Sequence, residues 1–224
     1  MRTALIAGAS GLVGTHLADK LAHYPAYEKV ISLGRRRVAL SHPRFDQIIV
    51  DFTRLHDVPA LEGVKVDDAF CTLGTTIRAA GSQEAFRKVD FDHIVSFAKL
   101  AKSLGARRFC LVSSAGANPQ SKLFYPRVKG ETEQAVEATG FESLHIFRPG
   151  LLTGHRPERR LAEQLAMLVM PLIDPLLLGS FSQWRSVPAA RVASAMIGAA
   201  ADPIRGTRVH SHHDIVDLAD FAGR

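Results

Sequence analysis

The sequence predicts an α/β fold in which helices cover both faces of a doubly wound parallel sheet. Short β-rich runs that are apolar throughout alternate with longer helical stretches along the chain, the pattern of a parallel sheet buried on both sides. The 224 residues suit one such domain, and no repeat, linker or low-complexity tract divides them. A glycine-rich turn directly follows the first apolar run.

The apolar runs are predicted as strands and the stretches between them as helices. The strand candidates are Thr3–Ala7, Val30–Leu33, Gln47–Val50, Asp68–Thr72, Phe109–Ser113, Leu144–Phe147 and Thr207–His210. The helical candidates are Gly11–His23, Ser82–Leu104, Tyr125–Thr139 and Pro188–Ala201. Gly105 and Gly140 follow two of these helices, where a left-handed C-terminal cap is expected.

Composition and charge narrow the class of protein. The chain is 46% hydrophobic and 22% charged, as expected for a globular protein with a real core. Its net charge is +6, but Lys and Arg are scattered, with short clusters only at Arg35–Arg37 and Arg159–Arg160. No RNP, KH or zinc-finger pattern is present, so a nucleic-acid partner is not predicted. A basic protein that binds an anionic cofactor explains the charge equally well.

Neither a signal peptide nor a membrane span is predicted. The apolar run at Thr3–Ala7 is too short for a signal peptide. The segment Leu161–Leu178 is apolar but contains a Glu, an Asp and two prolines, so we interpret it as a buried or lid helix followed by a loop. Cys71 and Cys110 each end an apolar run and are predicted as buried thiols in a reducing compartment, which favours a cytoplasmic location.

The glycine turn follows a GxxGxxG pattern between the first strand and the first helix. In this context glycines permit a tight turn, close approach of the backbone to a pyrophosphate, and packing of helix on strand. The helix N-terminus adds free N–H groups and a positive dipole end. The sequence therefore predicts a Rossmann fold that binds a dinucleotide through Gly8, Ser10, Gly11, Leu12, Val13 and Gly14.

The end of the second strand indicates which dinucleotide is bound. An NAD site usually has an Asp or Glu there for the ribose 2′-hydroxyl, whereas this strand runs into Gly34 and three arginines. A guanidinium suits a 2′-phosphate, so NADP(H) is predicted, with Arg35 as first choice and Arg36 as second. A solvated loop is the alternative interpretation of this run.

Two further strand ends are candidates for cofactor contacts. Asp51 and Phe52 end the third strand and are placed to bracket the adenine. Leu73, Gly74 and Thr75 follow the fourth strand, where the crevice at the strand ends should receive the cofactor. Both segments are ordinary loops on the alternative interpretation.

Tyr125 and Lys129 are four residues apart and therefore share one helix face. A free phenol has a pKa near 10 and is a poor acid–base at neutral pH. A neighbouring ammonium stabilises the phenolate, so that the phenol can exchange a proton with a carbonyl oxygen as hydride is transferred. Ser113 and Ser114 end a strand just upstream and deliver hydroxyls to the same end of the sheet.

Together the glycine turn, the serines and the YxxxK pair resemble the short-chain dehydrogenase/reductase superfamily, over nearly the whole chain. The closer resemblance is to its atypical branch, the Tat-interacting-protein-like oxidoreductases. The segments that carry it are Val112–Ala117, Phe124–Tyr125, Val128–Glu131 and Arg148–Gly150.

The resemblance implies residue roles. Tyr125 would be the acid–base, Lys129 its partner and a ribose ligand, and Ser114 the hydroxyl that orients the carbonyl, with Ser113 as a possible substitute. The turn after the sixth strand, with Pro149 and Leu152, would face the nicotinamide.

This chain departs from the superfamily pattern at three places. Where the superfamily often has Asn, this chain has Asp90, which leaves the usual proton relay without its Asn. Pro126 requires Tyr125 to lie in the first helical turn. The chain after Gly150 is short for a substrate lobe, and residues 151–190 are interpreted as a substrate-side or lid segment.

The leading hypothesis is an NADPH-dependent oxidoreductase for a small carbonyl or alcohol, with an apolar substrate suggested by Leu161–Leu178 and Trp184. The alternative is an NADPH-binding, redox-sensing regulatory protein. An epimerase or dehydratase that keeps its NAD is disfavoured by the arginines and the short C-terminal region. By resemblance, a homodimer through the helices Ser82–Leu104 and Tyr125–Thr139 is possible.

Two other polar clusters are interpreted without a catalytic role. The histidines of His210–Asp214 fit a strand end followed by a helix start, and no metal is predicted. Asp67 and Asp68 are interpreted as the solvated start of a strand rather than as paired catalytic carboxylates.

Overall fold

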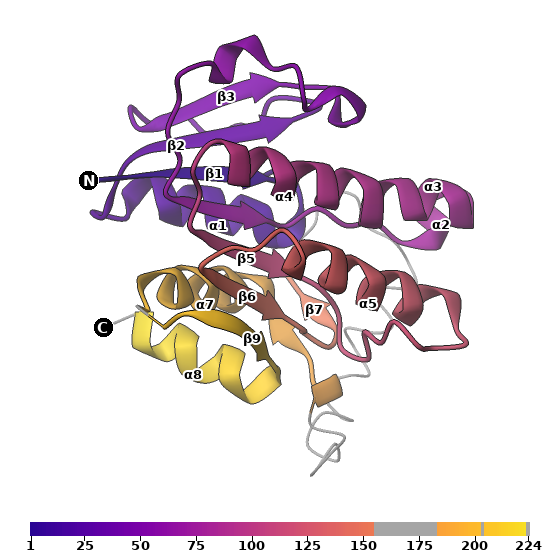
Figure 1. The fold of residues 1–224 in the computed structure, drawn as a ribbon. Helices are drawn as coiled ribbons and strands as arrows, with labels where there is room; N and C mark the ends of the chain where they lie inside the picture. The colour runs from indigo at the N-terminus through magenta and orange to yellow at the C-terminus, as the bar shows by residue number, and fades with distance from the viewer. Residues whose placement is uncertain (155–182, 203, 223–224) are drawn as a thin grey trace.

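A computed structural model describes residues 1–154, 183–202 and 204–222. Its main sheet has seven strands in the order β3-β2-β1-β4-β5-β6-β9, and each neighbouring pair is parallel (Figure 1). This order confirms the predicted doubly wound Rossmann fold. The strands are β1 Arg2–Ala7, β2 Tyr27–Gly34, β3 Phe45–Ile49, β4 Asp68–Cys71, β5 Arg108–Val112, β6 Ser143–Phe147 and β9 Gly206–His210.

Helices cover both faces of this sheet, with α3, α4 and α5 in front and α1 and α7 behind in the view of Figure 1. The front layer consists of α2 Ile77–Ala80, α3 Gln83–Arg87, α4 Ile94–Ser103 and α5 Phe124–Glu137. The helices behind are α1 Leu12–His23 and α7 Ala189–Ala201, and α8 His212–Ala222 packs on α7. Short 3₁₀ turns occupy Phe52–Arg54 and Pro59–Leu61.

The apolar character of each strand reflects these two layers. Along β1, Ala4 and Ile6 pack into the core beneath α1 and α7, whereas Leu5 and Ala7 pack into the core beneath α4. Successive side chains of a strand point to opposite faces, so a strand covered on both sides must be apolar at every position.

The predicted helix Ser82–Leu104 is interrupted in the structure. A π-helical segment, Lys88–His93, separates α3 from α4. A π turn inserts one extra residue into the helical ladder, and this one turns Asp90 into the protein interior. Gly105 and Gly140 have φ values of +96° and +75°, which confirms the left-handed conformation expected after the two helices.

A second, smaller strand pair lies beside the main sheet. It is formed by β7 Leu152–Thr153 and β8 Val187–Pro188, which run parallel. The segment Leu161–Leu178 and the arginines at 159 and 160 lie outside the described residues. Within the part of the chain that is described, no helix is long and apolar enough to cross a membrane.

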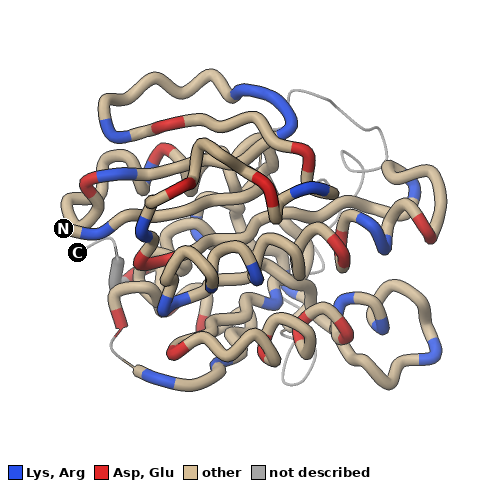
Figure 2. The backbone as a smooth tube through the Cα atoms, turned by 45° about the horizontal axis from the view of Figure 1, so that its top comes forward, with Lys and Arg blue, Asp and Glu red and all other residues tan. Residues whose placement is uncertain are grey.

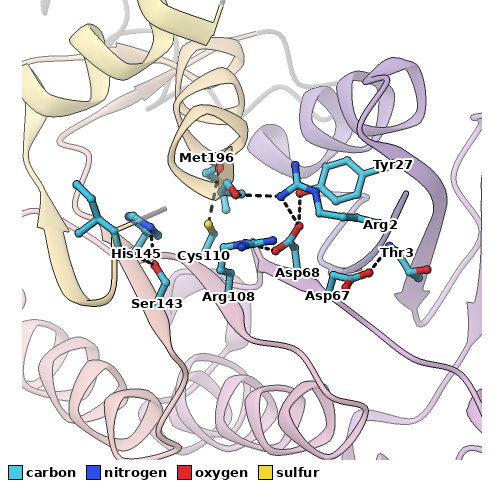
Figure 3. Close-up of polar contacts among 12 residues, drawn as sticks. Arg2, Thr3, Tyr27, Asp67, Asp68, Arg108, Cys110, Ser143, His145 and Met196 are labelled. Carbon is cyan, nitrogen blue, oxygen red and sulfur yellow. Dashed lines mark hydrogen bonds and ion pairs between the residues drawn. The ribbon is translucent and has the colours of Figure 1, made fainter. Parts of the chain in front are cut away.

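The interpretation of Asp68 as a solvated residue is wrong. Asp68 is 0% exposed, and it pairs with Arg2 at 3.0 Å and with Arg108 while accepting a 2.7 Å hydrogen bond from the Tyr27 hydroxyl (Figure 3). Burial and the Asp68 carboxylate raise the pKa of Tyr27. The residue at the rim is Asp67, which accepts a 2.8 Å hydrogen bond from the Thr3 N–H. Two arginines brought from other strands make the burial of Asp68 possible, which its neighbours in sequence do not reveal.

The two cysteines are buried, as predicted. Burial raises the pKa of the Cys71 thiol to about 12, and it also raises that of Cys110 well above the ordinary value. The Cys110 thiol donates to the Met196 carbonyl oxygen at 3.6 Å (Figure 3).

Candidate functional site

The glycine turn lies where the strand order reverses, between the carboxyl ends of β1 and β4. This is the position at which open α/β sheets bind their ligands. Gly8 has a φ of +92°, and a Cβ there would lie 2.6 Å from the Thr72 carbonyl carbon. Thr72 in turn donates its backbone N–H to the Ala7 carbonyl oxygen at 2.9 Å. The first residue after β1 therefore fits against β4 only as glycine.

The other two glycines bring helix α1 against this turn. A Cβ on Gly14 would lie 2.0 Å from the Gly8 carbonyl oxygen, so the helix approaches the turn without a side chain between them. Gly11 is the N-cap of α1 and makes no side-chain capping bond. The N–H groups of the first turn thus have no capping side chain, as an anion site at a helix N-terminus requires.

The remaining predicted residues of the turn differ in exposure. Ser10 is exposed, Leu12 is half-buried, and Val13 belongs to the core beneath α1. Leu12 and Val13 are the first two residues of α1, and the Val13 side chain anchors the helix in the core.

Lys129 lies in the next part of the crevice, 5% exposed. Its Nζ forms an ion pair with Asp90 Oδ1 at 2.7 Å. Asp90 Oδ2 accepts a 2.8 Å hydrogen bond from the backbone N–H of Thr75. A Cβ on Gly74 would meet Asp90 Oδ1 at 3.5 Å and Lys129 Nζ at 3.7 Å. The structure therefore brings Lys129 together with two of the three predicted residues after β4.

The electrostatics of Lys129 are set by two opposing effects. Burial by itself lowers the pKa of a lysine, but the interactions with Asp90, and to a smaller extent with Tyr125 and Cys71, together outweigh this and leave the pKa of Lys129 above its ordinary value. The ammonium is therefore held charged beside Tyr125, which stands one helical turn earlier on α5.

Tyr125 is the second residue of α5, which begins at Phe124. The prediction that Pro126 places Tyr125 in the first helical turn is confirmed. The Tyr125 ring packs on Phe86 with ring centroids 5.3 Å apart, and the side chain is half-buried. Packing on α3 thus orients the ring while leaving part of it accessible.

The two serines after β5 have different surroundings. Ser113 is buried and donates to Glu133 Oε1 at 2.5 Å, and Glu133 also accepts two hydrogen bonds from Arg148. Ser114 is half-buried and donates to the neighbouring Ala115 carbonyl oxygen at 3.1 Å. Because Ser113 is engaged in a buried network, the geometry favours Ser114 as the hydroxyl available to a ligand.

The turn after β6 forms a wall of the same region. The Pro149 carbonyl oxygen accepts a 2.9 Å hydrogen bond from the Ala115 N–H, which joins it to the serine loop. Leu152 pairs with Val187 in the small sheet. Trp184 packs so closely on Gly116 that a Cβ there would lie 2.6 Å from its ring, yet its side chain stays 45% exposed.

The predicted 2′-phosphate residues lie at the end of β2. Arg35 and Arg36 are exposed. Burial and the positive charges of Lys88 and Arg35 lower the pKa of His93 in the π turn. The His93 ring lies 5.5 Å from that of Phe52, and its Nε2 is buried without a hydrogen-bond partner among the described residues. Asp51 caps the 3₁₀ turn by accepting from the Thr53 N–H.

Sequence reasoning noted Asp90 but missed its partners, and it missed His93 and the Ser113–Glu133–Arg148 network. Asp90 and Lys129 come from different helices, so no sequence spacing signals their pairing. Glu133 sits four residues after Lys129, an interval that is a weak signal because it places both on one face of α5.

Two hollows on the described surface lie away from this crevice. One, of about 290 Å³, lies between α1 and α7 and is lined by residues that include Lys20 and Ser194. The other, of about 410 Å³, lies over β2 and β3 near Lys29 and Arg37. Neither is lined by residues of the glycine turn or by Tyr125 and Lys129.

Residues 4–186 match the model of the NAD dependent epimerase/dehydratase family. The chain belongs to this family. Protein HTATIP2 of Rattus norvegicus is 35% identical over 209 residues, covering 92% of this chain and 84% of that protein. The mitochondrial protein FMP52 of Coccidioides immitis is 31% identical, covering 98% of this chain and 94% of that protein. These relatives confirm the expected resemblance to an atypical short-chain dehydrogenase/reductase branch, and the family binds NAD(P).

Solved structures confirm the fold. The enzyme WbmH of Bordetella bronchiseptica in complex with NAD⁺ superposes with a TM-score of 0.70 at 18% identity, covering 98% of this chain and 79% of that one. MoeE5 in complex with UDP-glucose and NAD gives a TM-score of 0.68 at 17% identity, with coverage of 99% and 82%. Identities this low support the shared architecture alone.

Proposed function

We propose that this protein is an NADP(H)-dependent oxidoreductase that interconverts a small, apolar carbonyl compound and its alcohol. The observation that carries the proposal is the position of the Tyr125–Lys129 pair on α5: Lys129 is buried and lies against Gly74, in the same loop after β4 whose first residues contact Gly8 of the glycine turn. The residues fit a dinucleotide, because Gly8 and Gly14 let α1 pack directly on the turn after β1, and the α1 N-terminus that follows has no capping side chain to compete with a pyrophosphate.

Each side chain has a defined task in this proposal. When bound, NADPH supplies the hydride that reduces the carbonyl carbon. Tyr125 donates its hydroxyl proton to the carbonyl oxygen, which becomes the alcohol, and it is reprotonated from solvent. Ser114 orients that oxygen by hydrogen bonding, and Lys129 binds the ribose and stabilises the phenolate. We propose that the described parts of residues 151–190, including the exposed Trp184, border the substrate; residues 155–182 of this range lie outside the described residues.

A conservative substitution at Tyr125 tests catalysis. Tyr125→Phe should retain NADPH binding, measured by NADPH fluorescence, while reduction across a panel of apolar aldehydes and ketones falls by about 100-fold or more. Tyr24→Phe is the matched control, since Tyr24 follows the C-terminal end of α1, opposite to the glycine turn at its N-terminus. If the wild type binds NADPH but reduces no member of the panel, the oxidoreductase assignment fails and the NADPH-binding regulatory role becomes the better explanation.

The preference for NADP(H) rests on Arg35 and Arg36. In the double variant Arg35→Ala/Arg36→Ala, the Kd for NADPH should rise by about 10- to 100-fold, because charged hydrogen bonds to the 2′-phosphate are lost, while the Kd for NADH should not change. Arg205→Ala is the control, since that side chain is 83% exposed at the other end of the sheet. Equal NADPH affinities of the double variant and the wild type would exclude this role.

We also propose a cytoplasmic location and a homodimer, and each can be tested separately. The fungal relatives are named mitochondrial, so cell fractionation with a tagged protein decides the compartment. Lys and Arg are interspersed with Asp and Glu along the chain (Figure 2), which gives no support to a nucleic-acid partner. Sedimentation velocity tests the dimer, which would use the outer surfaces of α4 and α5.

A further inference from the structure

Asp90 is the buried centre of the π turn between α3 and α4. It is 0% exposed, and its backbone carbonyl oxygen accepts a 2.8 Å hydrogen bond from the Thr132 hydroxyl on α5. The π turn and the neighbouring helix therefore hold its main chain in place. π turns inside α-helices occur frequently at functional sites.

The two carboxylate oxygens of Asp90 serve different parts of the crevice. Oδ2 accepts from the Thr75 N–H at 2.8 Å, in the loop after β4. Oδ1 lies 2.7 Å from Lys129 Nζ and accepts no further hydrogen bond from the described residues. Gly74 passes directly over this pair, since a Cβ there would be in contact with both charged atoms. Asp90 thus connects the loop that borders the cofactor crevice with the lysine inside it.

The charge of Lys129 depends on this contact. The groups that face its ammonium are Asp90 on the π turn, Tyr125 on α5 and Cys71 on β4. Cys71 is a buried thiol with a pKa of about 12 and is uncharged near neutral pH. A lysine this deeply buried loses its proton readily unless an opposite charge lies beside it. Asp90 is the only carboxylate among these three groups, so it supplies that charge.

We propose that Asp90 is a positioning residue of the cofactor site, which keeps Lys129 protonated and fixes it to the loop at Thr75. The inference rests on the proposed function, since Lys129 is the residue that would bind the nicotinamide ribose. With Asp90 in place, the positive charge of the Lys129 ammonium is balanced by the Asp90 carboxylate, and its remaining N–H groups can donate to a ligand. Asp90 stands where the wider superfamily often has Asn. In this proposal its task is to hold Lys129.

The titration of Lys129 can be measured directly. In protein labelled with ¹³C-lysine, the Lys129 Cε resonance is assigned by its loss in Lys129→Met and followed by NMR as the pH rises. In the wild type it should titrate above the ordinary lysine value of about 10.4. In Asp90→Asn its midpoint should fall by about one to three pH units, because the opposite charge is gone.

Asp92→Asn is the matched control, an exposed acid on the same π turn, and it should leave the Lys129 midpoint unchanged. Equal midpoints in Asp90→Asn and the wild type would overturn the proposal. If Asp90→Asn does not fold, the wild-type titration decides alone, since a Lys129 midpoint below the ordinary value contradicts a stabilised ammonium.

Cofactor binding gives a readout that a purely structural role would not change. NADPH affinity of Asp90→Asn should match the wild type below the variant's Lys129 midpoint and weaken above it, whereas a packing defect would weaken binding at every pH. A wild type that binds no NADPH would refute the proposed function, while the NMR titration still decides whether Asp90 holds Lys129 in its charged form.

Discussion

At the scale of single residues, the site depends on side chains that are absent as much as on those present. The hydrogen of Gly14 faces the Gly8 carbonyl oxygen where a Cβ would come within 2.0 Å of it. The Gly8 carbonyl group belongs to the backbone, and the backbone of a packed turn has little room to move away. This contact therefore leaves no room for a side chain between α1 and the turn.

Gly14→Ala should force α1 away from the turn. We expect a loss of about 1–3 kcal/mol in unfolding free energy, as for overpacked cores, and no measurable NADPH binding at concentrations that saturate the wild type. Urea unfolding and NADPH fluorescence measure the two effects. His16→Ala, an exposed change on the same helix, should alter neither, and an alanine variant that binds NADPH normally would show that the turn has slack.

Residue-level prediction from sequence succeeds where the cause is local. Pro126 places Tyr125 in the first helical turn because proline is excluded from helix interiors. The burial of Asp68 and the pairing of Asp90 with Lys129 depend on strands and helices far apart in the sequence, and their charges by themselves suggest exposure. In both cases the burial of the acid depends on partners that are distant in sequence.

At the scale of the elements, the two ends of the sheet have different tasks. The carboxyl ends carry the crevice, whereas at the opposite end one buried carboxylate joins four neighbouring strands. Asp68 on β4 binds Arg2 on β1, Tyr27 on β2 and Arg108 on β5 (Figure 3). Removing one member of a buried ionic group leaves the others uncompensated.

Asp68→Asn should lower the unfolding free energy by about 3–5 kcal/mol, because Arg2 and Arg108 lose their anion in a buried setting. Asp67→Asn, one residue earlier and half-buried, should cost much less. Urea denaturation of both variants at neutral pH measures the difference. Equal losses would mean that Asp68 contributes no more than a peripheral acid.

Strands and long helices are predictable from sequence because their apolar periods of about 2 and 3.6 residues are imposed by the core. The π turn at Lys88–His93 was not predicted, since one extra residue changes the helical period too little to be seen in a window this short. Sequence analysis therefore located the helix but not the insertion that turns Asp90 inward.

At the scale of the whole molecule, two buried histidines join the sheet to its last strand. His145 Nδ1 lies 2.9 Å from His210 Nε2, and the rings stack with centroids 5.2 Å apart. On its other side, His145 Nε2 lies 2.9 Å from the Ser143 hydroxyl, which donates to the Ile204 carbonyl oxygen. Two facing nitrogens can share one proton but not two, so the stack disfavours a doubly charged pair.

This pair should make the fold acid-sensitive. Burial lowers the pKa of His145 to about 4 and also lowers that of His210. The unfolded chain then takes up protons first, so stability is complete above about pH 6.5 and falls as the pH drops towards 4. His145 alone should account for about 2 kcal/mol between pH 7 and pH 5.

Urea unfolding at the two pH values measures this loss. His145→Gln should be less stable than the wild type at pH 7 but lose less on acidification. The exposed His56→Gln should retain the wild-type slope. Parallel pH profiles of His145→Gln and the wild type would show that the stacked pair does not titrate on unfolding.

The two buried thiols make opening of the core measurable by chemical labelling. Cys71 and Cys110 are the only cysteines of the chain, and both are sealed in the core as unreactive thiols. An alkylating reagent can reach them only when the core opens, so the rate of labelling, read by mass, counts opening events. A compound that binds the folded protein should slow labelling, so ligands can be sought in mixtures before a substrate is known.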